Sequence, residues 1–280
     1  MNIQIITNCF EDDLEWLRSS PYPVRVFSKN KETKNNLDFA ESIDFVPNIA
    51  CEVTSYLYYI INYYDQLPER SVFIHGHENA NHQKMPICEA IEKFSSEDFV
   101  DINRFVNCYM ILLKESVYYN LWNYFFEEKP PVFLNFKYGS QFIVSSNKIK
   151  TRPKKFYEDI YRKIIFSPYF CMNKGYRFVL KNPSNKNPYV NNEQIMSAFD
   201  YLLNQEKLYY SKIYAQFFES VWHWIFNSDS GRPPSVKNEY VERFVSSPNE
   251  NIETHESYQN KEDFDNAVKK LAQTNLLQIK

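Results

Sequence analysis

The chain has 280 residues, of which 44% are hydrophobic and 24% are charged, and this composition excludes a mainly disordered protein. Lys and Arg number 32 against 35 Asp and Glu, so the net charge is −3, and no basic excess points to nucleic acid as a partner. Only four glycines occur, with neither GxGxxG nor GxxxxGK[ST], which excludes a glycine-rich phosphate loop.

The first part of the chain predicts alternating strands and helices. Apolar runs over residues 3–7, 24–27 and 71–74 are typical of buried strands. A short helix is expected near residue 16, and apolar side chains at helical spacing predict a second helix over 48–65, capped by its first residue, an asparagine. This order of elements predicts an α/β fold with a parallel sheet.

From residue 102 onward the pattern is mainly helical. Loops rich in Pro, Asn, Lys and Ser separate the elements, and the clearest boundary lies near residue 130, with both halves expected to share one sheet. The predicted elements are helices over 102–126, 153–165, 193–204, 211–226 and 261–278, a strand over 141–144, and a polar tail over 246–259.

Cysteine usage and the absence of long apolar runs bear on the cellular compartment in which the protein is expected. The five cysteines are widely spaced and include no CxxC pair, which argues against a disulfide scaffold and fits a reducing environment. The N-terminal segment has no basic region, and no run of about 18 apolar residues occurs anywhere in the chain. We therefore expect no signal peptide, no membrane span and a cytoplasmic location.

A first group of polar residues follows the predicted strand at 71–74. His75, His77 and Glu78 come directly after this strand, with His82 nearby. Ligands of open α/β sheets bind beyond the carboxyl ends of the strands, and imidazole and carboxylate groups are suitable metal ligands. The pattern predicts either a ligand site or a polar turn whose histidines hydrogen-bond to loop carbonyls.

Two further candidates lie in the C-terminal half. Glu219 and Trp222 are one helical turn apart, and an indole beside a carboxylate raises its pKa and makes it a better base. Arg232 and Lys237 occupy the following loop, where two cations can hold a pyrophosphate. The alternatives are a solvated helix residue with a core tryptophan, and two solvated loop cations.

An ordered set of short segments resembles one known family. The segments are Asp13-Leu14-Glu15-Trp16-Leu17, Pro47-Asn48-Ile49-Ala50-Cys51-Glu52, Val72-Phe73-Ile74-His75-Gly76-His77, Gln141-Phe142-Ile143-Val144-Ser145, and Glu219 with Trp222. The resemblance, which spans about residues 8–226, is to a family catalogued as a domain of unknown function in fungi, algae and large DNA viruses. It implies a GT-A-like glycosyltransferase that builds viral capsid glycans, similar to the xylosyltransferases of chlorella viruses.

A second resemblance concerns possible catalytic residues. Gly139-Ser140-Gln141-Phe142 is similar to the GSQ-aromatic segment of branching N-acetylglucosaminyltransferases, and Glu219-Ser220-Val221-Trp222 is similar to their E-x-x-W segment. This resemblance implies that Glu219 is the catalytic base and that Arg232 or Lys237 replaces a metal ion on the diphosphate. His75-Gly76-His77 stands where a DxD motif would follow the strand, so no cofactor is expected, and a role for Mn²⁺ or Mg²⁺ is not favoured.

These interpretations combine into one expectation for fold and domains. We expect an α/β, GT-A-like (Rossmann-like) mixed sheet flanked by helices. One glycosyltransferase domain is expected over residues 1–245, with a donor-binding half over about 1–130 and an acceptor half over 131–245. A polar tail with a C-terminal helix is expected over 246–280.

The expected activity is inverting transfer of a sugar, with xylose from UDP-xylose preferred, onto a glycan or glycoprotein acceptor in a host cell cytoplasm. Two alternatives remain: a metal-dependent hydrolase built on His75, His77, Glu78 and His82, and a non-catalytic carbohydrate-binding protein that uses its aromatic residues, 18% of the chain. The expected donor-binding residues are Asn8, Cys9, His75, His77, Arg232 and Lys237, and the expected acceptor-binding residues are Glu78, Ser140, Gln141 and Trp222.

Overall fold

The chain divides into two compact units, which are described separately. The first comprises Met1–Asn103 and Gly139–Phe218, and the second Arg104–Tyr138 and Glu219–Lys280. The single domain expected over 1–245 stays a prediction. The structure, a computed structural model, describes residues 1–30, 36–46, 48–78, 85–102, 107–112, 117–131, 133–136, 139–165, 212–226, 241–246 and 254–258.

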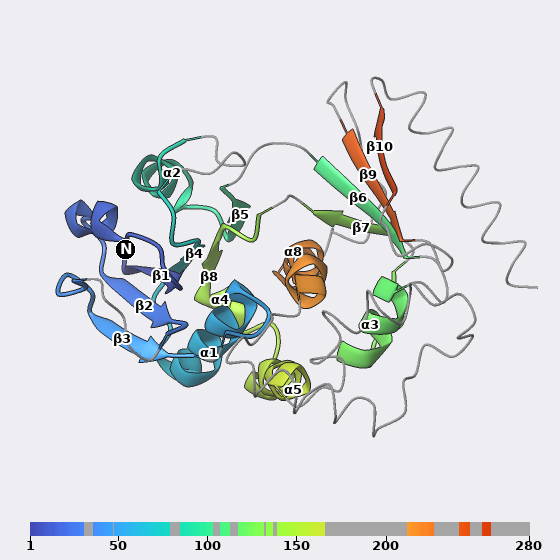
Figure 1. Cartoon of the computed structure of the whole chain (residues 1–280), viewed down its shortest axis with the longest axis horizontal. Coiled ribbons are helices and arrows are strands. Elements are labelled where there is room, and N and C mark those ends of the chain that lie inside the picture. Colours follow the sequence, from blue (N-terminus) through green and yellow to red (C-terminus); the bar gives the residue numbers. More distant parts are fainter. Residues whose placement is uncertain are drawn as a thin grey trace, which may run out of the picture. The chain divides into compact units, whose positions relative to one another are not determined.

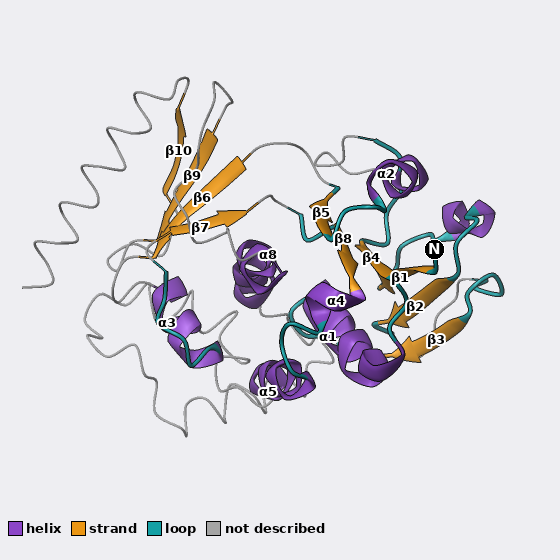
Figure 2. Cartoon of the chain, turned by 180° about the vertical axis from the view of Figure 1, so that it is seen from behind, coloured by secondary structure: helices purple, strands orange, loops and turns teal. Residues whose placement is uncertain are grey.

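A six-stranded mixed sheet forms the centre of the first unit, and its strands lie in the order β3-β2-β1-β4-β8-β5 (Figure 2). The first four strands in this order are parallel to one another, and β8 pairs antiparallel with both β4 and β5. This arrangement confirms the α/β, Rossmann-like mixed sheet. The strands are β1 (Ile3–Cys9), β2 (Val24–Ser28), β3 (Ser42–Phe45), β4 (Arg70–Ile74), β5 (Phe99–Asp101) and β8 (Phe142–Ser145).

The chain changes direction across the sheet between β1 and β4. From β1 it adds β2 and then β3 on one side, and it then returns to place β4 on the other side of β1. Such a reversal leaves a crevice at the carboxyl ends of the two strands, which is where open α/β sheets bind their ligands.

One face of the sheet packs against the short 3-10 helix η1 (Glu15–Ser19) and the helix α2 (Ile87–Phe94). Alternate strand residues Ile5, Val26 and Val72 join Leu17 and Ile91 in one buried cluster. The period of two along each strand assigns these side chains to one face and their neighbours to the other.

The helix α1 (Glu52–Tyr63) covers the opposite face, so α1 and α2 lie on opposite sides of the strands in Figure 1. The ring of Tyr56 lies 4.8 Å from that of Phe73, and Tyr59 meets Phe27 at 6.3 Å. These aromatic contacts hold α1 on the sheet. Because α1 runs back toward the start of β4, its first turn lies at the carboxyl edge of the parallel strands.

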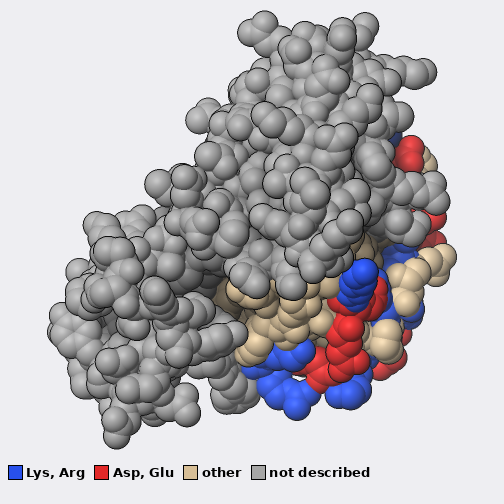
Figure 3. All heavy atoms as spheres, turned by 90° about the vertical axis from the view of Figure 1, so that its right-hand side faces the viewer, with Lys and Arg blue, Asp and Glu red and all other residues tan. Residues whose placement is uncertain are grey.

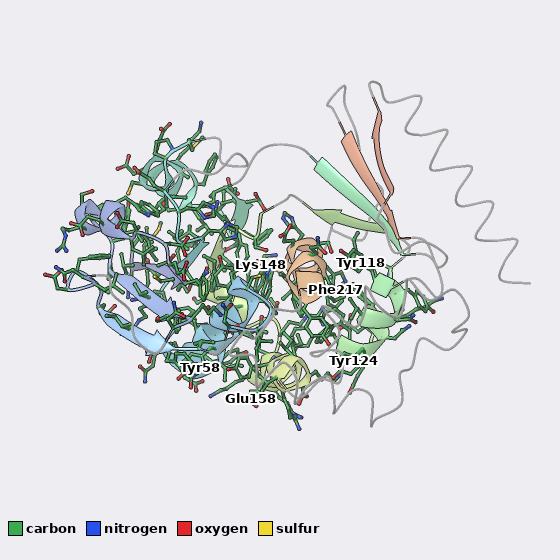
Figure 4. All side chains as sticks on the ribbon, viewed as in Figure 1. Tyr58, Tyr118, Tyr124, Lys148, Glu158 and Phe217 are labelled. Atoms are coloured by element: carbon green, nitrogen blue, oxygen red, sulfur yellow. The ribbon has the colours of Figure 1, made fainter. Side chains whose placement is uncertain are left out.

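Two further helices follow β8 in the first unit, α4 (Ser146–Ile149) and α5 (Lys154–Ile165). The Ser145 hydroxyl accepts a hydrogen bond from the Lys148 N–H at 3.2 Å and caps α4. The rings of Tyr58 on α1 and Tyr161 on α5 lie 6.4 Å apart, and Figure 4 shows Tyr58 near α5. On the described part of the face drawn in Figure 3, acidic and basic side chains are interspersed rather than gathered by sign.

The second unit contains a four-stranded sheet in the order β10-β9-β6-β7. Its strands are β6 (Asn107–Leu112), β7 (Phe133–Phe136), β9 (Val241–Ser246) and β10 (Thr254–Tyr258). The helix α3 (Val117–Phe125) belongs to this unit, and the boundary between the units falls within α8 (Lys212–Phe226). The ring of Trp122 lies 4.5 Å from that of Trp224, so α3 packs on the end of α8.

Three sequence-based expectations differ from the structure. The helix expected over 102–126 is instead β6 followed by α3, because a short apolar run does not distinguish a strand from a helix. The polar tail contains β10, which pairs with β9. The helix expected from Asn48 begins at Glu52, and the helices expected over 193–204 and 261–278 lie outside the described residues.

No helix in the described ranges has both the length and the apolar character that crossing a bilayer requires.

Candidate functional site

Polar residues from several strands meet at the carboxyl edge of the parallel sheet. Asn8 and Cys9 end β1, Lys29 follows β2, and His75 follows β4. Because β8 is antiparallel to β4, Gln141 enters the same edge, and its Oε1 accepts a hydrogen bond from the His75 N–H at 2.9 Å. The structure therefore brings together the expected residues Asn8, Cys9, His75 and Gln141.

The loops after β1 and β4 pack closely against each other. A Cβ added at Gly76 would lie 2.6 Å from the carbonyl oxygen of Asn8 and 2.9 Å from Cβ and Cγ of Asp12. The indole N–H of Trp16 donates to the carbonyl oxygen of Gly76 at 3.1 Å. Only glycine fits this position without a shift of the backbone, and the Trp16 ring is held in a fixed orientation beside the loop.

A pocket of about 430 Å³ opens beside these two loops, and it is lined by Asp12, Asp13, Trp16, His77 and Glu78. Carboxylates accept hydrogen bonds from hydroxyl groups, and an indole face packs against apolar C–H groups. Three carboxylates also repel a bare diphosphate. The pocket is therefore suited to a neutral, hydroxyl-rich group.

The two histidines after β4 lie close together, with ring centroids 5.2 Å apart. Within the ranges that the structure describes, no group of three or more His, Cys, Asp or Glu side chains has an arrangement that could hold a metal ion. His82 lies outside the described residues, so the metal site expected from His75, His77, Glu78 and His82 stays a prediction.

A buried pair of opposite charges lies at the same edge and was not expected from the sequence. Lys29 is 5% exposed and Glu52 is 7% exposed. The Lys29 ammonium donates to the Thr54 hydroxyl at 2.8 Å, and this hydroxyl donates to the carbonyl oxygen of Ile49 at 2.7 Å. The sequence signals were position, since Lys29 follows β2 directly and Glu52 lies in the first turn of α1, and the place of Glu52 in a segment of the family resemblance.

Burial shifts the pKa of both charged groups toward the neutral form. It lowers the pKa of Lys29 to about 7, against the opposing effect of the charges of Glu52 and Cys51. It also raises the pKa of Glu52, against the opposing effects of a backbone hydrogen bond, the Ser140 hydroxyl and the charge of Lys29. Perturbed groups of this kind in a ligand crevice are candidates for functional residues.

The backbone around Glu52 adopts an uncommon conformation. Ala50 and Cys51 have φ of 55° and 50°, and Ser140 has φ of 44°. Residues other than glycine rarely adopt the left-handed region, and such strain concentrates at functional sites. It also explains why α1 begins at Glu52 and not near Asn48, since Ala50 and Cys51 cannot be part of a right-handed helix.

One comparison with known proteins identifies the family. The sequence model of a family described as "Protein of unknown function (DUF3431)" matches residues 5–175, more than half of the chain. The chain belongs to the DUF3431 family. No curated protein matches it. The match to DUF3431 spans β1 through α5, and it includes the strand-end residues, the pocket and the buried pair.

The remaining expected site residues lie beyond the range that matches DUF3431. Trp222 is buried and its ring stacks on that of Phe226 at 5.7 Å, while Glu219 is half-buried on the same helix. Both belong to the second unit, so the catalytic role of Glu219 stays a prediction. Arg232 and Lys237 lie outside the described residues.

Proposed function

We propose that this DUF3431 protein is a glycosyltransferase that moves a sugar from a nucleoside diphosphate donor to a glycan acceptor. The observation that carries the proposal is the convergence of Asn8, Lys29, His75 and Gln141 at the reversal point between β1 and β4. Nucleotides bind at this place in open α/β sheets. The resemblance to chlorovirus xylosyltransferases favours UDP-xylose as the donor and a capsid glycan as the acceptor.

The pocket beside the β1 and β4 loops supports a sugar substrate. Its volume of about 430 Å³ accommodates a sugar ring, and its carboxylates at Asp12, Asp13 and Glu78 can accept hydrogen bonds from ring hydroxyls. The Trp16 indole provides the flat apolar surface on which sugar C–H groups stack. We assign this pocket to the acceptor sugar, since its negative charge disfavours the diphosphate.

The proposed chemistry is a single displacement. The acceptor hydroxyl oxygen attacks the anomeric carbon, its proton passes to the Glu219 carboxylate, and the bond from the anomeric carbon to the diphosphate oxygen breaks. The departing UDP gains negative charge, which cationic or hydrogen-bonding groups stabilise. Arg232, Lys237 and His75 are the residues proposed for this task, while His77 lines the acceptor pocket, in a cytoplasmic enzyme that needs no metal cofactor.

Thermal unfolding with a panel of UDP-, GDP- and CMP-sugars tests the proposal directly. We expect UDP-xylose and UDP to raise the melting temperature both with a chelator and with added Mn²⁺. Product formation from UDP-xylose in the presence of a glycan then separates transfer from simple binding. The absence of a shift with every nucleotide sugar would refute the proposal, and a shift that the chelator abolishes would refute its metal-free form. Binding without turnover would favour a carbohydrate-binding protein.

A further inference from the structure

Several buried polar atoms of the described residues lack a hydrogen bond of standard geometry, and two of them lie close together near the start of α1. They are Oε1 of Glu52 and Oγ of Ser140, and the Ser140 hydroxyl is close enough to Glu52 to influence its ionisation. Buried polar atoms are normally paired, so two unsatisfied atoms side by side call for an explanation. The capacity to hydrogen-bond to a ligand is one such explanation.

The backbone of two separate loops is strained to bring these atoms together. Ala50 and Cys51 precede Glu52, and Ser140 precedes β8, and all three residues have positive φ. The loops come from segments about 90 residues apart in the chain, so local sequence alone does not impose the arrangement. Strain of this kind persists where the surrounding structure and a function maintain it.

The chemistry of the group restricts what it can bind. The Glu52 carboxylate repels a phosphate, and the nearby Lys29 ammonium repels a metal cation. A hydroxyl group carries no charge and can donate to a carboxylate while it accepts from a serine. Two adjacent hydroxyl groups of a ligand can therefore pair with both residues. One donates a hydrogen bond to the Glu52 carboxylate, and the other donates to or accepts from the Ser140 hydroxyl.

We propose that Glu52 and Ser140 bind a pair of adjacent hydroxyl groups on a sugar ring, with Lys29 supplying the charge opposite Glu52. The inference rests on the proposed function, and it adds a second sugar-binding site, on the α1 face, to the pocket on the η1 face. The diol belongs either to the ribose of the nucleotide or to the sugar that is transferred.

Isothermal titration calorimetry with matched ligands and variants separates these sources. The ligands are UDP, 2′-deoxy-UDP and UDP-xylose, and the variants are Glu52→Gln, Ser140→Ala and, as control, Glu41→Gln. Glu41 is the appropriate control because it also faces a basic residue, Arg25 of β2, with 2.8 Å between Oε1 of Glu41 and Nη2 of Arg25. Hydrogen bonds to charged groups are worth about tenfold or more in affinity.

If the ribose is bound, the wild-type chain prefers UDP over 2′-deoxy-UDP by about tenfold or more. If the transferred sugar is bound, it prefers UDP-xylose over UDP by a similar factor. In either case the preference falls close to one in Glu52→Gln and Ser140→Ala and is kept in Glu41→Gln. A wild-type chain without either preference, or variants that keep it, would overturn the inference.

Two measurements keep the result interpretable. If Glu52→Gln does not fold, Ser140→Ala carries the same comparison, since alanine tolerates the same φ as serine. If no nucleotide binds the wild-type chain, amide NMR shifts of Ser140 are followed with free ribose and xylose. A response to a pentose then keeps the diol site and retracts the nucleotide donor, and no response retracts both.

Discussion

The indole N–H of Trp16 and the carbonyl oxygen of Gly76 are joined by a hydrogen bond of 3.1 Å, although the two residues are 60 positions apart in the chain. The bond ties the loop that follows β1 to the loop that follows β4. At the reversal point of the sheet, the Trp16 side chain therefore joins the two loops, and the lack of a side chain at Gly76 lets them approach closely.

Replacement of Gly76 by alanine should strain this junction. The new Cβ would lie 2.6 Å from a backbone oxygen that cannot rotate away, and overpacking of this kind costs about 1–3 kcal/mol. Urea unfolding of Gly76→Ala measures the loss of unfolding free energy. Glu78→Ala is the control in the same loop, and because Glu78 is exposed we expect a change within about 0.5 kcal/mol. Equal stability of the two variants would contradict the close packing at Gly76.

Because Lys29 is buried, the free energy of unfolding should increase as the pH rises above neutrality. The pKa of Lys29 is about 7 in the folded chain and 10.5 in the unfolded chain. Between these values the unfolded chain holds one more proton, so the free energy of unfolding rises with pH by up to about 1.4 kcal/mol per unit. Unfolding by urea between pH 7.5 and 9.5 tests this, and Lys29→Met should lose the rise.

The exposed Lys155, which pairs with Asp159 on α5, provides the control for Lys29. Lys155→Met should keep the slope of the wild-type chain, because the Lys155 side chain is exposed to solvent and not buried. Identical slopes in Lys29→Met and the wild type would mean that Lys29 is solvated.

Removal of the His77 side chain should weaken ligand binding more than folding. His77 is exposed and lines the pocket, so His77→Ala should leave the melting temperature nearly unchanged. We expect the KM for the acceptor to rise by about tenfold, which is the effect of one lost hydrogen bond in a binding site. Lys150→Ala, an exposed change outside the pocket, should leave both quantities unaltered. A lower melting temperature with unchanged KM would make His77 structural.

Glu219→Gln tests the proposed base. The change keeps the size of the side chain but removes its ability to accept a proton, and general-base catalysis is worth about 10²–10⁴-fold. Turnover should fall at least about a hundredfold while UDP binding is kept, and Glu219→Asp should also be slow because the carboxylate is withdrawn. Gln216→Ala, an exposed change on the same helix, should be neutral. If Glu219→Gln retains more than about a third of the turnover, Glu52 and Asp13 become the next candidates.

The strands that the sequence predicts well are those that are buried on both faces. β1, β2, β4 and β8 are rich in Ile, Val and Phe and are buried along most of their length, which is typical of strands inside a sheet that is covered on both faces. β3 was missed because its four residues alternate between half-buried and exposed positions and contain a serine and an aspartate. β6 was taken for a helix because an apolar run of that length is compatible with either structure.

The same physical reason separates the predicted part of the site from the missed part. Asn8 and His75 were predicted because they adjoin strands whose carboxyl ends share one edge, whereas Gln141 was expected from the resemblance of its segment. The burial of Lys29 beside Glu52 was not predicted, because charged residues are almost always solvated unless a partner compensates them. That partner comes from another segment of the chain, and the periodicity of the sequence holds no information about it.

The position of β3 at the end of the first sheet has a practical consequence for work with the purified protein. Its Ile43 and Phe45 are 48% and 45% exposed, and an outermost strand with apolar side chains is a template for pairing with a strand of another molecule. Concentrated samples are therefore expected to self-associate along β3. Ile43→Lys would place a charge on this strand and keep the protein monodisperse for calorimetry and NMR.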